Sequence, residues 1–302
     1  MKGYLTLLFK KKYHKYFALG ESYNISGWLF LFLCKLFTRK KIYYWTHGFY
    51  GKENRIEALL KKIQYGLADG VFPYGDYSRE LMIKHGLDGN KIWSIHNSLD
   101  YDKQLALRST LKHTDIYARH FGNDRPVLVF IGRLTAVKRL DLLIDALAIL
   151  HKQGNDYNLA LIGDGSEREK LEKLAKERGV KDSVWFYGAC YDEATTGELI
   201  YNADLCVAPG NIGLTAMHVM AFGTPAATHN NFPYQMQEFE AIHEGITGTF
   251  FDYNNPNSIA MAIQRWFELP GKDREKVRQA CYHEIDTKWN PHYQIEIITN
   301  HL

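Results

Sequence analysis

The sequence predicts an α/β fold with two doubly wound, Rossmann-like domains, each built on a parallel sheet. Two series of apolar, strand-like segments alternate with segments of helical periodicity, and such alternation places crossover helices over parallel strands. The length of 302 residues suits two domains of ordinary size. We expect a first domain at residues 1–112, a second at residues 113–285, and a final segment, residues 286–302, that packs back on the first domain.

The composition is that of a globular protein with a filled core, since 46% of the residues are hydrophobic and 24% are charged. A net charge of +3 is too small to indicate a nucleic-acid partner, so none is expected. The cysteines show no metal-ligand spacing, which favours a reduced, cytoplasmic setting and no metal site; they are Cys34, Cys190, Cys206 and Cys281.

The first domain is expected to contain strands at residues 16–19, 41–46, 70–73 and 91–95, separated by helices over residues 26–37, 53–67 and 78–84. The apolar run at residues 25–37 has 13 residues and includes Lys35, whereas a bilayer span needs about 20. It is therefore interpreted as a buried or interfacial helix. Residues 100–125 are polar and are interpreted as the passage between the domains.

The second domain shows the same alternation more clearly. Strands are expected at residues 127–131, 158–162, 183–186 and 204–208, and helices over residues 138–153, 167–178, 193–202, 257–268 and 273–286. Glycine or proline follows these strands, so the loops at the carboxyl ends of the sheet are suited to close approach by a ligand.

The stretch at residues 208–228, A-P-G-N-I-G-L-T-A-M-H-V-M-A-F-G-T-P-A-A-T, predicts a strand end, a turn, a helix and a second strand. A turn of small residues before a helix presents free N–H groups and the positive end of the helix dipole. Such a site suits a phosphate group. The alternative interpretation is an ordinary strand-turn-helix unit of a doubly wound protein.

Two cations follow the first strand of the second domain, in the segment G-R-L-T-A-V-K-R. Arg133 offers a planar fork of donors and Lys138 a mobile point charge, and both suit a phosphate. The alternative is that both are surface cations of a loop. Because the turn before Leu214 should emerge at the same sheet edge, the two cations and the helix N-terminus together suit a diphosphate.

From residue 127 to residue 268 the chain resembles the donor-binding domain of GT-B glycosyltransferases, specifically the large retaining family 4, or group 1. The resemblance is carried by five motifs in a fixed order: V-L-V-F-I-G-R-L-T-A-V-K-R-L-D-L-L-I-D-A-L, L-A-L-I-G-D-G-S-E-R-E-K-L, V-W-F-Y-G, Y-N-A-D-L-C-V-A-P and G-L-T-A-M-H-V-M-A-F-G-T-P. It implies two Rossmann-like domains that face each other across a cleft.

The resemblance also implies roles for particular residues. Arg133 and Lys138, which follow Gly132, are expected to bind the diphosphate of a nucleotide-sugar donor. Backbone N–H groups near it are expected from Gly213, Leu214 and Thr215. The loop by the nucleobase is expected to consist of Phe186, Tyr187 and Gly188.

The chain departs from the family pattern at two positions. Members usually carry two glutamates eight positions apart, one near the transferred sugar and one on the ribose, where this chain has Gly210 and His218. A histidine makes fewer hydrogen bonds than a carboxylate accepts, so the ribose contact is expected to be altered. Glu238 and Glu240 are candidates to supply a carboxylate, and the alternative is that both lie at an exposed helix start.

The first domain is shorter than the family's acceptor domain, and no glycine-rich loop opens it. Its segment T-H-G-F-Y-G follows a buried strand and resembles the histidine loop of that domain. His47 is therefore the expected active-site histidine, near the acceptor hydroxyl or the transferred sugar, although a lone histidine is often structural.

The resemblance implies a retaining hexosyl transfer from a nucleotide-diphosphate sugar to an acceptor hydroxyl, with cations and dipoles in place of a metal and with no cofactor. The competing hypothesis is a non-catalytic partner subunit that binds the nucleotide sugar. An NAD-dependent oxidoreductase is disfavoured, because the turn after residue 162 lacks the third glycine of a dinucleotide site.

The acceptor is expected to be a polysaccharide or a lipid-linked glycan. Basic residues at positions 10–12 and 39–41 lie near the aromatic residues Trp28 and Phe32, which suggests peripheral contact with the inner face of a membrane. The alternative is that these charges form a solvated face.

Overall fold

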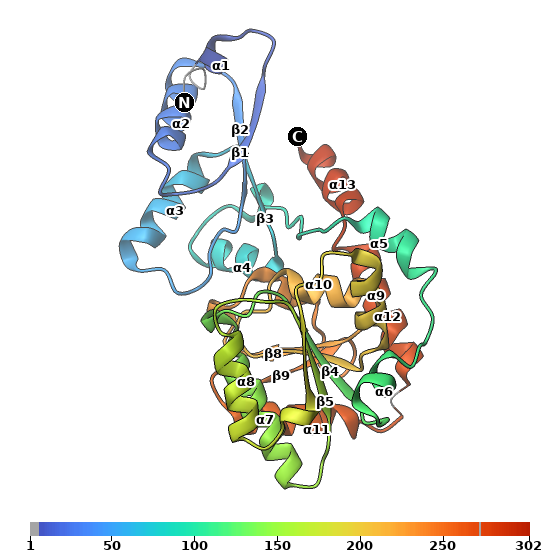
Figure 1. Cartoon of the computed structure of the whole chain (residues 1–302). Helices are drawn as coiled ribbons and strands as arrows, with labels where there is room; N and C mark the ends of the chain where they lie inside the picture. The colour runs from blue at the N-terminus through green and yellow to red at the C-terminus, as the bar shows by residue number, and fades with distance from the viewer. Residues whose placement is uncertain (1–5, 272) are drawn as a thin grey trace. The chain divides into compact units, whose positions relative to one another are not determined.

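The computed structural model describes residues 6–271 and 273–302. The chain forms two compact units: residues up to 97 together with residues 291–302, and residues 98–290 (Figure 1). The division after residue 97 precedes the boundary expected at residue 112. Residues 98–112 belong to the second unit because helix α5 (Tyr101–Arg108) packs against α9 (Glu193–Asn202) and α10 (Leu214–Ala221).

The first unit contains a parallel sheet in the order β1-β2-β3. Its strands are β1 (Lys15–Leu19), β2 (Lys41–Thr46) and β3 (Gly70–Pro73). The crossover helices α2 (Ile25–Phe37) and α3 (Arg55–Leu67) share one core cluster with the sheet, and α4 (Asp76–Lys84) follows β3. Asn24 and Asn54 cap α2 and α3 by accepting from backbone N–H groups of the first turn. A short helix, α1 (Thr6–Phe9), precedes β1.

The strand expected at residues 91–95 does not form. A 3₁₀ turn, η1 (Gly89–Lys91), leads into extended chain that donates from Trp93 N to Val71 O at 3.0 Å and has only one isolated bridge to β3. Trp93 and Ile95 of this segment pack on α13 (Pro291–His301), which covers the face of the sheet formed by Tyr43 and Phe72. Gln294 Nε2 of α13 donates to His96 O at 2.7 Å.

The second unit contains a six-stranded parallel sheet in the order β6-β5-β4-β7-β8-β9. The strands are β4 (Val127–Ile131), β5 (Asn158–Ile162), β6 (Val184–Gly188), β7 (Leu205–Ala208), β8 (Ala226–His229) and β9 (Gly248–Phe251). The central strands are continuous apolar runs because both faces of the sheet are buried.

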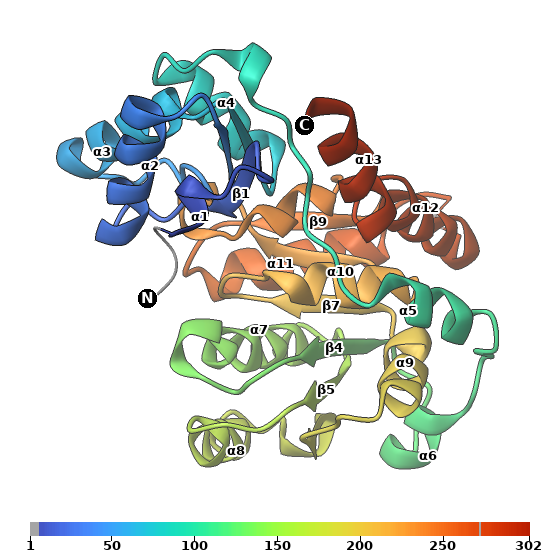
Figure 2. The ribbon, with the colours of Figure 1, turned by 90° about the horizontal axis from the view of Figure 1, so that it is seen from above.

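Helices cover both faces of this sheet (Figure 2). One face carries α7 (Leu140–Lys152), α8 (Arg168–Glu177) and α11 (Pro256–Phe267), which pack together. The other face carries α9, α10 and α12 (Arg274–Thr287). The polar passage at residues 100–125 contains α5 and α6 (Ile116–Phe121), which pack on α9. No helix within the described residues is both long and apolar enough to cross a membrane.

The helix expected from residue 138 begins later. Arg139 adopts a left-handed conformation with φ of 50°, which separates the 3₁₀ turn η2 (Ala136–Lys138) from α7. Lys138 therefore lies in a loop beside the carboxyl end of β4 rather than in the first turn of a helix.

Candidate active site

The strand order of the second sheet reverses between β4 and β7. The chain leaves β4 toward β5 and β6 on one side and returns to β7, β8 and β9 on the other, while β4 and β7 pair directly. Ligands of open α/β sheets bind at such a switch point, beyond the carboxyl ends of the strands. The segments that follow these two strands are residues 132–139 and residues 209–213, which contain Gly132, Arg133, Lys138 and Gly213 of the donor-binding residues expected from sequence.

Lys138 ties these two segments together. Its Nζ donates to Asn211 O at 2.8 Å and to Asn211 Oδ1 at 3.0 Å, while Gly210 N donates to Lys138 O at 3.0 Å. Burial lowers the pKa of Lys138, and the negative charge of Glu238 opposes that effect. Lys138 is thus a positioning residue as well as a charge at the switch point.

The backbone of residues 137 and 138 fills the space beside Gly210. A Cβ atom at this position would lie 2.1 Å from Val137 O and 2.8 Å from Lys138 Cα. These are backbone atoms, so no side chain fits without a shift of the loop. The space beside Gly210 is therefore occupied by the close approach of the two loops.

Arg133 is the cation that remains available at the switch point. Its side chain is exposed and, within the described residues, has no hydrogen bond or ion pair. Gly132 precedes it with φ of +144°, a conformation that favours glycine. Leu134 N donates to Asp164 O at 3.0 Å and so fixes the loop on the turn that follows β5.

Helix α10 begins beside this loop. Gly213 is its N-cap, and the N–H groups of Gly213 and Leu214 have no earlier helical carbonyl to which they can donate. We expected the N–H group of Thr215 to be available to a diphosphate. It donates instead to Ile212 O at 3.3 Å, and the Thr215 hydroxyl donates to Ile131 O at 3.0 Å. Thr215 thus joins the helix to the end of β4.

Gln235, which the sequence did not single out, fixes the turn before α10. Ile212 N donates to Gln235 Oε1 at 2.9 Å, and Gln235 Nε2 donates to Thr228 Oγ1 at 2.8 Å and to His229 O at 3.1 Å. The buried amide therefore connects the turn with the carboxyl end of β8.

His218 faces a carboxylate from a neighbouring helix. Its Nε2 lies 3.1 Å from Glu193 Oε1, and the same oxygen accepts from Gln104 Nε2 at 2.9 Å. The hydrogen bond from His218 and that from Gln104 lower the pKa of Glu193, against the effect of burial. The carboxylate of Glu193, on α9, thus lies next to His218, on α10.

Glu238 is buried, with 2% of its surface exposed, and Glu240 is half-buried. Both lie in the 3₁₀ helix η5 (Gln237–Ala241), which packs against α10. The interpretation of the two residues as an exposed helix start is therefore wrong. The charge of Glu238 acts on Lys138, so this carboxylate belongs to the environment of the switch point.

The segment expected by the nucleobase lies at the end of β6, the edge strand of the sheet. Arg168 Nη2 donates to Phe186 O at 3.3 Å, and Gly163 N donates to Gly188 O at 2.8 Å. Tyr187 turns to the opposite side from Phe186 and contacts Trp185, with ring centroids 5.0 Å apart.

His47 belongs to the first unit and follows β2 at the carboxyl edge of the first sheet. Its carbonyl accepts from Ser78 Oγ at 3.0 Å, and the same hydroxyl oxygen accepts from Phe49 N at 3.0 Å. Thr46 Oγ1 accepts from Gly48 N at 3.0 Å. The loop that carries the imidazole is therefore fixed by hydroxyl groups of buried side chains.

Glu53 fixes the second half of this loop, a role that the sequence did not reveal. It accepts from Tyr50 N at 2.7 Å and Gly51 N at 2.9 Å, and it pairs with the buried Lys61 at 2.8 Å. These hydrogen bonds lower the pKa of Glu53 despite its burial, and the Glu53 carboxylate raises the pKa of Lys61.

A pocket of about 460 Å³ opens beside His47. Aromatic rings from β2, from α3 and from the loops after β1, β2 and β3 line it together with polar groups of the loop after β1. The lining includes Tyr23, Trp45, Tyr50, Tyr74, Glu21 and Asn24. The His47 ring lies 4.6 Å from that of Tyr74. Ring faces with hydroxyl, amide and carboxylate groups around them are suited to a polar ring compound such as a sugar.

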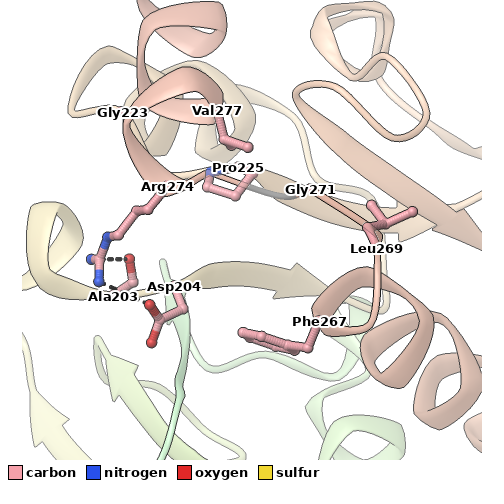
Figure 3. A pocket seen from close by; sticks show the side chains of 9 residues that line it. All are labelled: Ala203, Asp204, Gly223, Pro225, Phe267, Leu269, Gly271, Arg274 and Val277. Atoms are coloured by element: carbon pink, nitrogen blue, oxygen red, sulfur yellow. Dashed lines mark hydrogen bonds and ion pairs between the residues drawn. The ribbon is translucent and has the colours of Figure 1, made fainter.

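Another pocket, of about 340 Å³, lies at the opposite edge of the second sheet (Figure 3). Asp204 and Pro225 precede β7 and β8 there, and Arg274 spans the floor of the pocket by binding Asp204 Oδ1 and Ala203 O, each at 2.9 Å. Because the pocket faces the amino ends of the strands, we do not assign it to the ligand edge.

A parallel doubly wound unit with cations and a helix N-terminus at its switch point defines a nucleotide-binding domain of the GT-B type. The family model of the group 1 glycosyl transferases matches residues 114–284. The chain therefore belongs to the group 1 glycosyltransferase family.

Curated relatives match over part of this chain. Alpha-D-kanosaminyltransferase of Streptomyces kanamyceticus is 27% identical over 162 residues, which is 53% of this chain and 41% of the relative. The GDP-mannose-dependent alpha-(1-6)-phosphatidylinositol dimannoside mannosyltransferase of Mycobacterium tuberculosis is 33% identical over 156 residues, or 50% of this chain and 38% of the relative. The matched region is thus about two fifths of each relative.

Solved structures match across both units. Alr3699/HepE of Anabaena, in complex with UDP, aligns with a TM-score of 0.74 at 17% identity and covers 98% of this chain and 80% of its own. The lipopolysaccharide outer core galactosyltransferase WaaB aligns with the same score and identity, over 98% of this chain and 76% of its own. Both likenesses establish the GT-B fold.

Proposed function

We propose that this protein transfers a hexosyl group from a nucleotide-diphosphate sugar to an acceptor hydroxyl, with retention of configuration and without a metal ion. The observation that carries the proposal is Arg133, an exposed cation without a protein partner among the described residues, at the switch point beside the first N–H groups of α10. Such an arrangement suits a diphosphate leaving group.

The chemistry follows from the charge that develops on the leaving diphosphate. Arg133 binds it as a bidentate donor, Lys138 and the N–H groups of Gly213 and Leu214 add positive potential, and none of them has to reorganise during the reaction. Glu238, close to Lys138, supplies the carboxylate on the sugar side, while the pair of His218 and Glu193 contacts the ribose. The loop of residues 186–188 lies by the base.

His47 acts on the acceptor side, where the neighbouring pocket holds the acceptor glycan. The acceptor is a polysaccharide or a lipid-linked glycan, and support for the latter is that the mycobacterial relative is named for a phosphatidylinositol dimannoside acceptor. The reaction takes place in the cytoplasm, on the inner face of the membrane. Support for this setting is that the four cysteines are free, three of them buried.

A specific observation favours a second function. The contact of Gly210 with Val137 O leaves no room for a side chain at the position of the family's first glutamate. A protein that binds the nucleotide sugar but does not turn it over, as a partner subunit of another transferase, is consistent with this loss.

A panel of UDP- and GDP-linked hexoses separates the two functions. Binding is measured by thermal shift, and hydrolysis or transfer by release of the nucleotide over a set of glycan and lipid-linked acceptors. Release that requires the sugar donor and falls at least about tenfold in Arg133→Ala supports the transferase. Binding without release over every acceptor supports the partner subunit, and the absence of binding contradicts both.

A further inference from the structure

The outer surface of the first unit is apolar on two neighbouring helices. In α2 the side chains of Ile25, Leu29, Phe32 and Leu36 are 83%, 47%, 44% and 73% exposed, and their spacing places them on one face. The opposite face of the helix contributes Phe30, Leu31 and Cys34 to the core. A helix that is apolar all round normally has nonpolar surroundings on every side.

Helix α3 shows an inverted pattern. Its buried residues, Lys61, Gln64 and Tyr65, are polar or amphipathic and form hydrogen bonds inside the unit. Its aliphatic residues follow helical spacing on the outer face, where the most exposed, Ile56 and Leu59, are 72% and 57% exposed; the others are Leu60, Ile63 and Leu67. Water is a poor environment for such a stripe.

The two stripes lie on the same face of the first sheet. Both crossovers advance in the same direction along the order β1-β2-β3, which places α2 and α3 together, and they lie side by side in both views (Figures 1 and 2). We call their exposed apolar residues the α2–α3 surface: Ile25, Leu29, Phe32, Leu36, Ile56, Leu59, Leu60, Ile63 and Leu67.

Cations surround this surface. Lys40 Nζ donates to Lys10 O at 2.7 Å, so the basic segments at residues 10–12 and 39–41 meet just beyond the end of α2. Arg55 and Lys62 are exposed on α3, whereas among residues 6–70 the exposed carboxylate is Glu21. Residues 1–97 have 16 Lys and Arg against 7 Asp and Glu, and the remaining residues have 21 against 27.

We propose that the α2–α3 surface docks on an anionic lipid membrane. Its aliphatic side chains enter the boundary between headgroups and acyl chains, and the cations at residues 10–12, 39–41, 55 and 62 contact the acidic headgroups. The excess of positive charge around an apolar surface is the observation that favours this occupant, because it is complementary to acidic headgroups next to acyl chains. This proposal specifies the surface that makes the membrane contact of the proposed function, and it does not require the protein to transfer a sugar.

The structure changes which aromatic side chain is expected to face the membrane. Trp28 was expected to lie at the membrane, but its Nε1 donates to Ser22 O at 2.9 Å and the ring is partly buried against the core cluster. Phe32, which stacks on Trp28, is the exposed member of the pair.

Flotation with lipid vesicles tests the proposal. The full chain is mixed with vesicles of phosphatidylcholine alone or with phosphatidylglycerol added, at low and at high salt. We expect the wild-type protein to float with the anionic vesicles at low salt. The fraction of protein recovered with them should fall on the order of tenfold or more in the double variant Lys11→Glu/Arg39→Glu. Leu36→Gln/Leu59→Gln, which keeps every cation, should also lose binding to the anionic vesicles at low salt, because its apolar side chains no longer enter the membrane.

The matched control is Ile246→Gln/Met261→Gln, which replaces residues of the second unit that are 57% and 61% exposed. The control should float as the wild type does, and thermal shift with UDP should be unchanged in all variants, so that a failed docking surface is distinguished from a failed donor site. Equal recovery with neutral and anionic vesicles would overturn the proposal. So would a dimer in light scattering that Leu36→Gln/Leu59→Gln dissociates, since the surface would then be a protein interface.

Discussion

His218 Nε2 lies 3.1 Å from Glu193 Oε1, and this pair joins α10 to α9. Glu193 also accepts from Gln104, which joins α5, α9 and α10. The pair therefore keeps a carboxylate at the site and contributes to the packing of three helices.

The pair makes a glutamate unfavourable at position 218. We expect His218→Glu to lower the free energy of unfolding by about 1–2 kcal/mol, because it places two carboxylates face to face and removes a hydrogen bond to a charged group. The exchanged pair, His218→Glu/Glu193→His, should recover most of the loss. Urea unfolding measures both, and a single variant as stable as the wild type would show that the pair does not form.

The contribution of the pair to stability also depends on pH. The folded pKa of Glu193 is lower than the unfolded value of 4.5, so its stabilising effect is complete above that pH and is lost as the pH falls through the folded pKa. We expect Glu193→Gln to be less stable than the wild type at neutral pH and the difference to shrink below about pH 4. Chemical unfolding at a series of pH values measures it, and a difference that grows on acidification would contradict this account.

Gly210 should tolerate no side chain. Gly210→Ala forces its Cβ against Val137 O, so we expect a loss of about 1–3 kcal/mol in unfolding free energy and weaker binding of nucleotide diphosphates. Gly66→Ala is the control, because the nearest atom to its Cβ would be 3.6 Å away and alanine favours the helix. If Gly210→Ala is as stable as the control, the two loops are not in the contact described.

Lys138 should stabilise the loop at Asn211 as well as contribute positive charge to the binding of a diphosphate. Lys138→Met removes the hydrogen bonds to Asn211, so we expect a loss of about 1–3 kcal/mol in stability together with weaker diphosphate binding. Lys173→Met, at a lysine that is 79% exposed on α8, should leave both quantities unchanged. A variant Lys138→Met that melts with the wild type would mean that Asn211 is held by other contacts.

The second sheet was predictable from sequence, whereas several contacts of the site were not. Buried parallel strands are continuous apolar runs bounded by glycine or proline, so Val127–Ile131 and Asn158–Ile162 were found with the observed bounds. The contact of Gly210 with Val137 joins residues far apart in the chain, and the carboxylate of Glu193 lies on another helix from His218. No local pattern marks either contact.

The errors have physical causes. The segment at residues 91–95 is as apolar as a strand, but its side chains serve the contact with α13, which periodicity does not reveal. The sequence does not reveal that Lys61 is buried, because its burial depends on the neutralising carboxylate of Glu53. Glu238 is buried because it lies three residues before the buried Ala241 in a 3₁₀ helix, where three residues per turn place both on the same side.

Calorimetric titration of the wild type and Arg133→Ala with UDP, GDP, UMP and GMP tests the central claim most directly, namely that the switch point of the second sheet binds a nucleotide diphosphate through Arg133. We expect one diphosphate to bind at least about tenfold more tightly than its monophosphate, and Arg133→Ala to lose most of that preference while its melting temperature stays unchanged, since the guanidinium has no partner among the described residues. Equal affinity of the wild type for diphosphates and monophosphates, or a preference that survives in Arg133→Ala, would contradict it.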